Sequence, residues 1–415
     1  HELQSRLDEH TAYIGWLDAK FADDMLTSTA PFLNARWMYM IRRSEPIQWR
    51  PIYEVRTRSQ DAAVRNDSRQ FYAVIGRAAN WRGRVDDDPE LKRLALHVFH
   101  AEFGPGAFEL KGIDKLVAEF ACYDEWMQSD GLVDDSGHYL SERYAVSYSP
   151  SASVYDVLVN SLHHQHASAP EVLAIGDPVY SHTSAPATDS RIDEVTLRSA
   201  INHDAGALDR LPALPYSGVE IDSVQALFHD CRVLRGDDAS EVTVDKIVTR
   251  PSASKFDIVH IATHALVDRQ PERCAIALSR DGTDGSVSND GLIDASEIRM
   301  GWKLDAELVT LSACQTAGVG FHRGEPSGFA QALFQAGARC VLLTFWKVDD
   351  RATSLLMSRF YENVAAYSRH GETISYSEAL EGAKNWLRTY QDAKGNRPFA
   401  HPVYWSGFVL IGDAN

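Results

Sequence analysis

From residue 139 onward, short apolar runs alternate with segments of helical periodicity. The runs are rich in β-branched residues and lie at 144–148, 171–176, 231–234, 256–262, 307–311 and 338–346. Such runs are typical of strands that are buried on both faces of a parallel sheet. Because helical segments separate them, the pattern predicts an α/β fold in which helices cover both faces of a mainly parallel sheet.

The first 138 residues show a weaker pattern. Residues 36–43 and 46–53 predict the two strands of a hairpin. Residues 88–100 predict a helix, because an Asp-Pro-Glu start precedes it and a Gly-Pro-Gly stop follows it. The apolar spacing over 113–127 predicts a second helix.

Length and composition indicate a globular protein with two domains. A chain of 415 residues is long for one simple core, so we expect domains over 1–138 and 139–415.

The formal net charge of −17 argues against a general nucleic-acid binder, since contact with phosphates requires clustered Lys and Arg. The five cysteines have no regular spacing, which fits reduced thiols better than a disulfide framework. No apolar run approaches a membrane span and no signal peptide is visible, so we expect no contact with a membrane. The reduced thiols fit a cytoplasmic protein, and the charge fits one that does not contact nucleic acid.

Two of the apolar runs end near a reactive side chain. One run leads to His264 and Ala265, and the other leads to Cys314. In open parallel sheets the chemistry lies at the carboxyl ends of the strands. A thiol must lose its proton to attack a carbonyl group, and a nearby His supplies the base. The pair therefore indicates a cysteine nucleophile, Cys314, with His264 as its base.

Both residues have an alternative interpretation. A free Cys is usually a small buried hydrophobic residue, but the sequence Gln-Thr-Ala-Gly after Cys314 favours exposure at the edge of the sheet. His260 competes with His264 for the role of base, because it lies four residues earlier on the same face of the strand. A His in the middle of a strand is by default a satisfied core residue, so we prefer His264. Cys340 lies inside an apolar run and is expected to be buried.

Ordered motifs extend over the same part of the chain. They lie at 142–153, 175–178, 260–264, 311–316, 324–325, 336–339, 346–350, 401–405 and 408–413. Together they resemble the CHAT family of caspase-like cysteine proteases, relatives of caspases and separase. So many matches in order form a more specific signal than a lone Cys or His. Ala265 and Ala317 stand where the family usually has Gly.

The resemblance carries implications for fold and mechanism. It implies a caspase-like sheet, with the hairpin near Trp37 and Trp49 as part of a degenerate, pseudo-caspase-like first half. It also implies a regulated cysteine endopeptidase with a Cys314–His264 dyad, found in bacterial antiviral defence. The backbone N–H groups of Ala265 and Cys314 are the expected oxyanion donors. No metal or organic cofactor is expected.

Substrate preference and activation involve two further segments. Asp349 and Asp350 precede a helix predicted over 351–361, where Asp caps the free N–H groups of a helix start. In related separases an acidic residue in this region lines the pocket for the residue before the cut. One of the two would then favour Arg or Lys at that substrate position. The polar segment 270–291 is expected to be a loop that becomes ordered on activation.

The expected partners are a protein substrate and a regulatory protein or upstream repeat domain. Because the sequence begins at His1 rather than Met, we expect further chain upstream. Two alternative functions stay open. One is a catalytically silent caspase-like scaffold, against which the presence of both His264 and Cys314 argues. The other is a thiol hydrolase of small amides or esters, against which the absence of an evident closed small-molecule motif argues weakly.

Overall fold

The computed structural model forms two compact units. It describes residues 2–20, 34–56, 70, 89–103, 110, 112–119, 130–160, 170–180, 208–250, 256–268, 270–280, 290–313, 316, 321–322, 325–326, 328–370, 373 and 375–414. The first unit comprises His1–Asn160 and Leu380–Ser406, and the second comprises Ser161–Ala379 and Gly407–Asn415. Compactness does not test the domain limits expected at 138 and 139, which stay a prediction.

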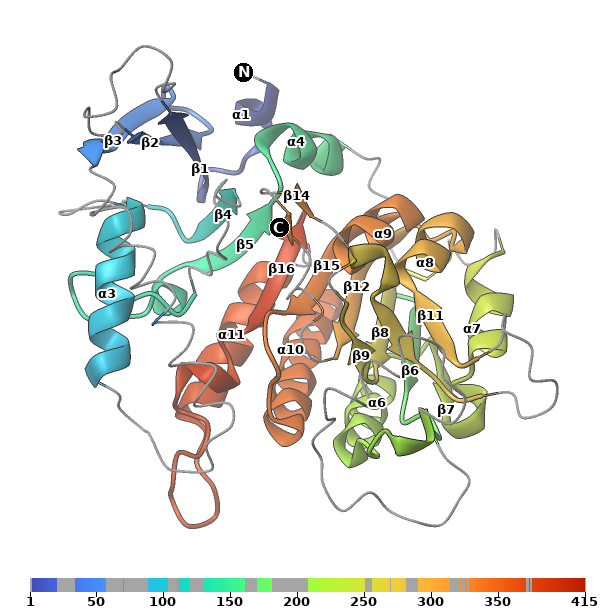
Figure 1. Cartoon of the computed structure of the whole chain (residues 1–415). Helices are drawn as coiled ribbons and strands as arrows, with labels where there is room; N and C mark the ends of the chain where they lie inside the picture. The colour runs from blue at the N-terminus through green and yellow to red at the C-terminus, as the bar shows by residue number, and fades with distance from the viewer. Residues whose placement is uncertain are drawn as a thin grey trace, which may run out of the picture. The chain divides into compact units, whose positions relative to one another are not determined.

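The first unit contains five strands in the order β3-β2-β1-β4-β5 (Figure 1). Their bounds are β1 (Thr11–Lys20), β2 (Asn34–Arg42), β3 (Gln48–Arg56), β4 (Lys115–Glu119) and β5 (Ala145–Ser149). Strand β2 pairs antiparallel with both β1 and β3, whereas β4 pairs parallel with both β1 and β5. The predicted hairpin is confirmed, with Tyr39 opposite Trp49.

The helices of the first unit follow the sequence signals in part. They are α1 (Glu2–Arg6), α3 (Pro89–Phe103), α4 (Ala152–Asn160) and the 3₁₀ turns η2 (Leu140–Glu142) and η7 (Pro402–Tyr404). The predicted helix after Asp88 is confirmed as α3. The helix predicted over 113–127 is wrong in its described part, where Lys115–Glu119 forms β4. Leu116, Val117 and Ala118 are all buried, and such a short run does not by its spacing separate a strand from a helix.

The second unit contains six strands in the order β16-β15-β12-β8-β6-β7. Their bounds are β6 (Val172–Gly176), β7 (Cys231–Arg235), β8 (Ile258–Ala262), β12 (Ala306–Ser312), β15 (Ala338–Thr344) and β16 (Phe408–Gly412). All neighbours pair in parallel except β16, which runs antiparallel to β15. The predicted mainly parallel sheet is therefore confirmed in this unit.

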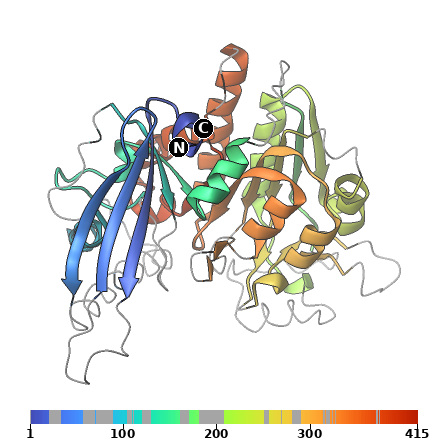
Figure 2. The ribbon, with the colours of Figure 1, turned by 90° about the horizontal axis from the view of Figure 1, so that it is seen from above.

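Helices cover both faces of this sheet. They are α6 (Pro215–Leu227), α7 (Glu241–Val248), α8 (Ala295–Gly301), α9 (Phe329–Ala336) and α10 (Asp350–His370), with α11 (Tyr376–Thr389) crossing the limit between the units. Helices α6 and α10 pack together on one face, and α8 and α9 lie on the other (Figure 2). Helix α9 ends at Gly337, whose φ of 108° lies in the left-handed region, and a Cβ there would come 2.1 Å from the carbonyl oxygen of Leu304. The chain can therefore reverse directly from α9 into β15.

Smaller elements complete the second unit. A three-stranded antiparallel sheet has the order β11-β10-β9, with β9 at Ala265–Leu266, β10 at Ala275–Ala277 and β11 at Leu292–Asp294. The remaining elements are β13 (Phe321–His322), β14 (Glu325–Pro326), η3 (Leu208–Arg210), η4 (Gly236–Asp238) and η6 (Pro271–Arg273). The prediction of a loop over 270–291 is wrong for β10, whose residues are fully buried against its neighbours. Residues 281–289 of that segment lie outside the described residues.

Candidate active site

The ends of β8 and β12 lie at the same level of the sheet. Ala262 on β8 and Ser312 on β12 are register partners. His264 follows two positions after Ala262, and Cys314 follows two positions after Ser312 in the sequence. Cys314 itself lies outside the described residues. The structure therefore describes the strand that leads to the predicted nucleophile, and those contacts of the predicted base that lie within the described residues.

The imidazole of His264 is buried, and its ring makes one hydrogen bond to the described part of the chain. Its exposed fraction is 6%, and its Nε2 lies 2.7 Å from the carbonyl oxygen of Pro212. A carbonyl oxygen only accepts, so Nε2 carries the proton in the neutral ring and Nδ1 holds the lone pair. Nδ1 has no hydrogen-bond partner among the described residues. The ring is thus oriented by one nitrogen, while the other meets no polar partner within the described ranges.

The environment of His264 favours its neutral form. Burial lowers the pKa of the imidazole to about 4, and the positive charge of Lys347 acts in the same direction. The hydrogen bond to Pro212 opposes this shift but is the smaller effect. Since the ordinary pKa of His is about 6.5, the ring is unprotonated at neutral pH. A neutral imidazole is the form that accepts a proton from a thiol.

The backbone amide of Ala265 points away from its neighbouring strand. The amide of Ala277 donates to the carbonyl oxygen of His264 at 2.9 Å, which makes these two residues a hydrogen-bonded pair. Ala265 and Ile276 form the next pair of the antiparallel ladder, where N–H and C=O point outward. Strand β9 is at the edge of its sheet, so this amide points off the free edge. Asp177 is the one non-Gly residue with positive φ among those described, so the backbone at Ala265 does not demand Gly.

The chain on either side of Cys314 is tied to one residue. Thr344, at the end of β15, donates from its hydroxyl to the carbonyl oxygen of Ala313 at 2.5 Å. Its amide donates to the hydroxyl of Thr316 at 2.9 Å. All three residues are buried. The residues that flank the predicted nucleophile are therefore fixed to the carboxyl end of the adjacent strand.

Asp349 and Asp350 have different environments. Asp349 caps α10, because its Oδ1 accepts from the amide of Ala352 at 2.9 Å, and the residue is exposed. Asp350 is half-buried, and its Oδ2 accepts from the amide of Tyr216 at 3.3 Å. Burial, helped by the negative charges of Glu220 and Asp349, raises the pKa of Asp350 to about 6. Asp350 has no ion-pair partner among the described residues.

His260 is a core residue of the sheet. It is fully buried, with Nδ1 3.0 Å from the hydroxyl of Tyr361 and Nε2 2.9 Å from Oε1 of Glu220. Tyr361 in turn donates to the hydroxyl of Thr310 at 2.9 Å. Both ring nitrogens face polar groups of the protein interior. This environment fits the core role expected for a His in the middle of a strand.

The described cysteines and acidic residues offer no second site. Burial raises the pKa of Cys231 and Cys274 to about 11, and raises that of the fully buried Cys340. These thiols therefore stay protonated at neutral pH. No group of three His, Cys, Asp or Glu side chains in the described ranges has the arrangement of a metal site. No helix in the described part of the chain has the length and apolar character needed to cross a bilayer.

Comparison with known proteins gives distant relatives. Human tetratricopeptide repeat protein 28 is 27% identical over 168 residues, and the mouse protein is 26% identical over 110 residues. These matches cover 39% and 26% of this chain but only 6% and 4% of the relatives, so the chain spans a small part of their length.

Two solved structures are also similar. Gingipain R, an Arg-specific cysteine proteinase, has a TM-score of 0.43 at 10% identity, covering 83% of this chain and 75% of gingipain R. The Saccharomyces cerevisiae separase–securin complex has a TM-score of 0.44 at 10% identity, covering 99% of this chain and 30% of that chain. Likeness at this level assigns no activity.

The family assignment comes from a family model rather than from single relatives. The model of the CHAT domain matches residues 127–413, which is well over half of the chain. This range contains the β8 and β12 strand ends, the predicted dyad and both aspartates. It also contains the motifs that indicated the family from the sequence. The chain therefore belongs to the CHAT domain family.

Proposed function

We propose that this chain is a cysteine endopeptidase in which Cys314 is the nucleophile and His264 is the base. The observation that carries the proposal is the state of His264. Its Nε2–H is donated to Pro212, its Nδ1 has no hydrogen-bond partner among the described residues, and its low pKa keeps it neutral. At His260, by comparison, both ring nitrogens lie within 3.0 Å of a polar side-chain atom, namely the hydroxyl of Tyr361 and Oε1 of Glu220.

The proposed reaction uses one proton that moves between two residues. Sγ of Cys314 gives its proton to Nδ1 of His264, and the thiolate forms a bond to the peptide carbonyl carbon. When the tetrahedral intermediate collapses, the C–N bond breaks and His264 returns the proton to the leaving amine. Water, losing a proton to Nδ1, then attacks the thioester and releases the acid. The thiol and the neutral imidazole are restored.

The backbone supports this chemistry in two ways. Ala262 and Ser312 are partners in the parallel sheet. His264 comes two residues after Ala262, and Cys314 comes two residues after Ser312. The outward amide of Ala265 is a suitable donor to the developing oxyanion, with the amide of Cys314 as the second donor. Thr344 holds the residues flanking Cys314 and so limits the conformations available to the nucleophile.

For specificity, we assign the acidic pocket residue to Asp350 and the capping role to Asp349. A half-buried carboxylate without a cation is costly, and a basic side chain of a substrate would compensate for its lost hydration. Its backbone partner Tyr216 and the His264 partner Pro212 lie in one short segment, residues 212–216. Substrates with Arg or Lys before the cleaved bond would therefore bring their charge to the segment that also orients the base.

Regulation by a partner is the second part of the proposal. The human and mouse relatives are named for tetratricopeptide repeats, so a repeat-bearing segment or protein is the proposed regulator of this chain. The antiviral role and the cytoplasmic location stay predictions of the family resemblance. The protein substrate likewise remains to be identified by experiment.

The test is mass spectrometry of peptides released from a native proteome. The wild-type chain is compared with Cys314→Ala, which removes only the thiol. We expect cut sites in the wild type, enriched in Arg or Lys before the cut and missing with Cys314→Ala. Equal cutting by both proteins would contradict the proposal. If neither cuts but the wild type hydrolyses small thioesters or amides, the chain is a small-molecule hydrolase, and inactivity on all substrates favours the scaffold alternative.

A further inference from the structure

The main chain of His264 is held by two contacts besides its ring. Its amide donates to the hydroxyl of Tyr180 at 3.2 Å, and its carbonyl oxygen accepts from the amide of Ala277 at 2.9 Å. Tyr180 comes 84 positions earlier in the chain. A side-chain hydroxyl from a distant segment therefore takes the place of a strand partner for the amide of the predicted base.

The hydroxyl of Tyr180 belongs to a chain of hydrogen bonds with one direction. The hydroxyl of Thr263 donates its one proton to the carbonyl oxygen of Ala277. It therefore accepts from the hydroxyl of Tyr180, 2.8 Å away, which itself accepts from the amide of His264. Burial raises the pKa of Tyr180, so the phenol keeps the proton that this direction requires. All the groups involved are buried, and an unmade hydrogen bond there costs the desolvation of the orphaned group.

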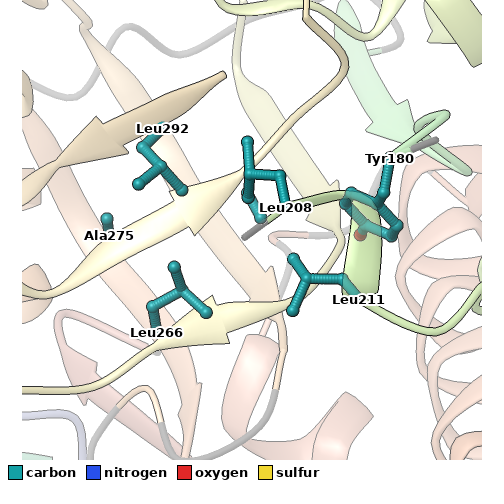
Figure 3. Packing of buried hydrophobic residues seen from close by; sticks show 7 residues of the cluster. Tyr180, Leu208, Leu211, Leu266, Ala275 and Leu292 are labelled. Atoms are coloured by element: carbon teal, nitrogen blue, oxygen red, sulfur yellow. The ribbon is translucent and has the colours of Figure 1, made fainter. Parts of the chain in front are cut away.

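The ring of Tyr180 is fixed in an apolar cluster. The cluster consists of Tyr180, Leu208, Leu211, Leu266, Ala275, Ala277 and Leu292 (Figure 3). It joins the small sheet β9–β10–β11 to the turn that precedes α6. Leu211 comes immediately before Pro212, whose carbonyl oxygen receives Nε2–H of His264. The centroids of the Tyr180 and His264 rings are 5.2 Å apart, and the ring planes form an angle of 36°. The same cluster therefore positions the two groups that contact the His264 ring, which are the Tyr180 ring and the carbonyl group of Pro212.

A sequence motif explains how Tyr180 reaches this position. The motif at 175–178 ends at Asp177 and Pro178, just before Tyr180. Asp177 has a φ of 51°, a conformation that Asp tolerates, and its side chain accepts from Nε of Arg235 at 2.9 Å. The carbonyl oxygen of Asp177 accepts from the amide of Gly236 at 3.1 Å. The turn is therefore held by Arg235 at the end of β7 and by Gly236 at the start of η4, and the segment that follows it reaches His264 through Tyr180.

We infer that Tyr180 is the positioning residue of the proposed base: its hydroxyl and ring hold His264 where Nε2 bonds to Pro212 and Nδ1 has no partner among the described residues. The inference rests on the proposed function, because it names the residue that orients the proposed base. Tyr180 touches no reacting atom. It acts through the backbone and the ring of His264.

The experiment compares Tyr180→Phe with Tyr361→Phe. The first variant removes the hydroxyl that holds His264 and keeps the apolar ring. The second removes a buried hydroxyl that contacts His260 on the same strand, so it matches the loss of a buried hydrogen bond. We expect kcat to fall about 10- to 100-fold in Tyr180→Phe with little change in KM, because a misplaced base weakens the chemical step. Tyr361→Phe should lower the melting temperature comparably and keep kcat within about threefold.

A second readout does not depend on activity. The measurement is NMR of the protein with ¹⁵N-labelled histidine, and the ring signals of His264 are assigned by their absence in His264→Gln. In the wild type, these signals should keep the chemical shifts of a neutral imidazole down to about pH 4. In Tyr180→Phe the ring should become hydrated and titrate closer to pH 6.5. If Tyr180→Phe does not fold, Thr263→Val and Thr263→Ser replace it. The Ser variant keeps the hydroxyl and should rescue kcat, whereas the Val variant should not.

Two results separate the inference from the function on which it rests. Wild-type kcat and an unchanged His264 titration in Tyr180→Phe, with an inactive Cys314→Ala, would overturn the role of Tyr180 alone. Full activity of Cys314→Ala would instead overturn the dyad, and the titration of His264 would still decide whether Tyr180 positions its ring.

Discussion

His260 and His264 lie four residues apart on and just beyond β8, and both are buried. The regions around them differ in how the two ring nitrogens are used. At His260 both nitrogens face side chains from α6 and α10, namely Glu220 and Tyr361. At His264 one nitrogen is fixed by a backbone carbonyl and the other has no partner among the described residues. The two buried His residues therefore differ in what lies near the second ring nitrogen, which is a carboxylate at His260 and no described polar group at His264.

Exchanging each His for Gln sharpens this comparison most strongly. Gln keeps an N–H donor at the end of its side chain but cannot act as a base. We expect His264→Gln to lower kcat by about 10²- to 10⁴-fold, the usual contribution of a general base. His260→Gln should instead lower the free energy of unfolding by about 1–3 kcal/mol, because one Gln side chain cannot replace both contacts of the buried imidazole, with Tyr361 and with Glu220.

Peptidase kinetics and urea unfolding of the two variants check this prediction. Rates are expressed per folded molecule, so that lost stability is not counted as lost catalysis. An activity that survives in His264→Gln and disappears in folded His260→Gln would reverse the assignment of the base.

The pH dependence of stability tests the environment of His264. The folded pKa of His264 is about 4 and lies below the ordinary value of about 6.5. Above pH 6.5 neither state carries the proton, so the contribution is constant. Between pH 6.5 and 4 the unfolded chain binds a proton that the folded chain does not, so stability falls as the pH falls, by about 3 kcal/mol in all.

Denaturant unfolding of the wild type and of His264→Gln at pH 7 and pH 4.5 measures this contribution. The wild type should lose more stability than the variant over that interval. The difference removes the effects of other titrating groups, which both proteins share. An equal loss in both proteins would mean that His264 is hydrated in the folded chain.

The two aspartates form a smaller contrast of the same kind. Asp350→Asn should weaken cleavage after Arg by about 1.5–3 kcal/mol, the usual value of a charged hydrogen bond. For the wild type, kcat/KM on such a substrate should fall as the pH drops below about 6, where Asp350 takes up a proton.

The raised pKa of Asp350 also means that its ionised carboxylate destabilises the fold. Asp350→Asn should therefore be more stable than the wild type at pH 7.5 by roughly 1–2 kcal/mol, and equally stable at pH 4.

Asp349→Ala is the matched comparison for the acidic pocket. Loss of the α10 cap should lower stability by about 1 kcal/mol with the substrate preference unchanged. Cleavage of peptide pairs that differ only in Arg against Leu before the cut checks both variants. If Asp350→Asn leaves that ratio unchanged, the acidic-pocket proposal fails and only the capping role stands.

The sequence predicted the parts of this molecule that depend on local patterns. The apolar runs predicted β8, β12 and β15. The sequence predicted a helix in place of β4 and a loop in place of β10. Both strands are so short that the spacing of their apolar residues does not distinguish a strand from a helix or a loop.

The contacts that orient the candidate site come from distant positions. Pro212 lies 52 residues before His264, Tyr180 lies 84 residues before it, and Thr344 lies 28 residues after Thr316. A backbone carbonyl has no sequence signature, so Pro212 was not predictable as a partner. Tyr180 follows the motif at 175–178, which was the one available signal for it.

The most direct measurement of the central claim is covalent trapping of the nucleophile. A peptidyl acyloxymethyl ketone with Arg at the position before the reactive group is incubated with the wild type and with His264→Gln, and the adduct is located by peptide mapping. The account predicts a single adduct on Cys314 in the wild type and little or none in His264→Gln, because the thiol there lacks its base. An adduct on Cys231, Cys274 or Cys340, or equally fast labelling of Cys314 in both proteins, would contradict it.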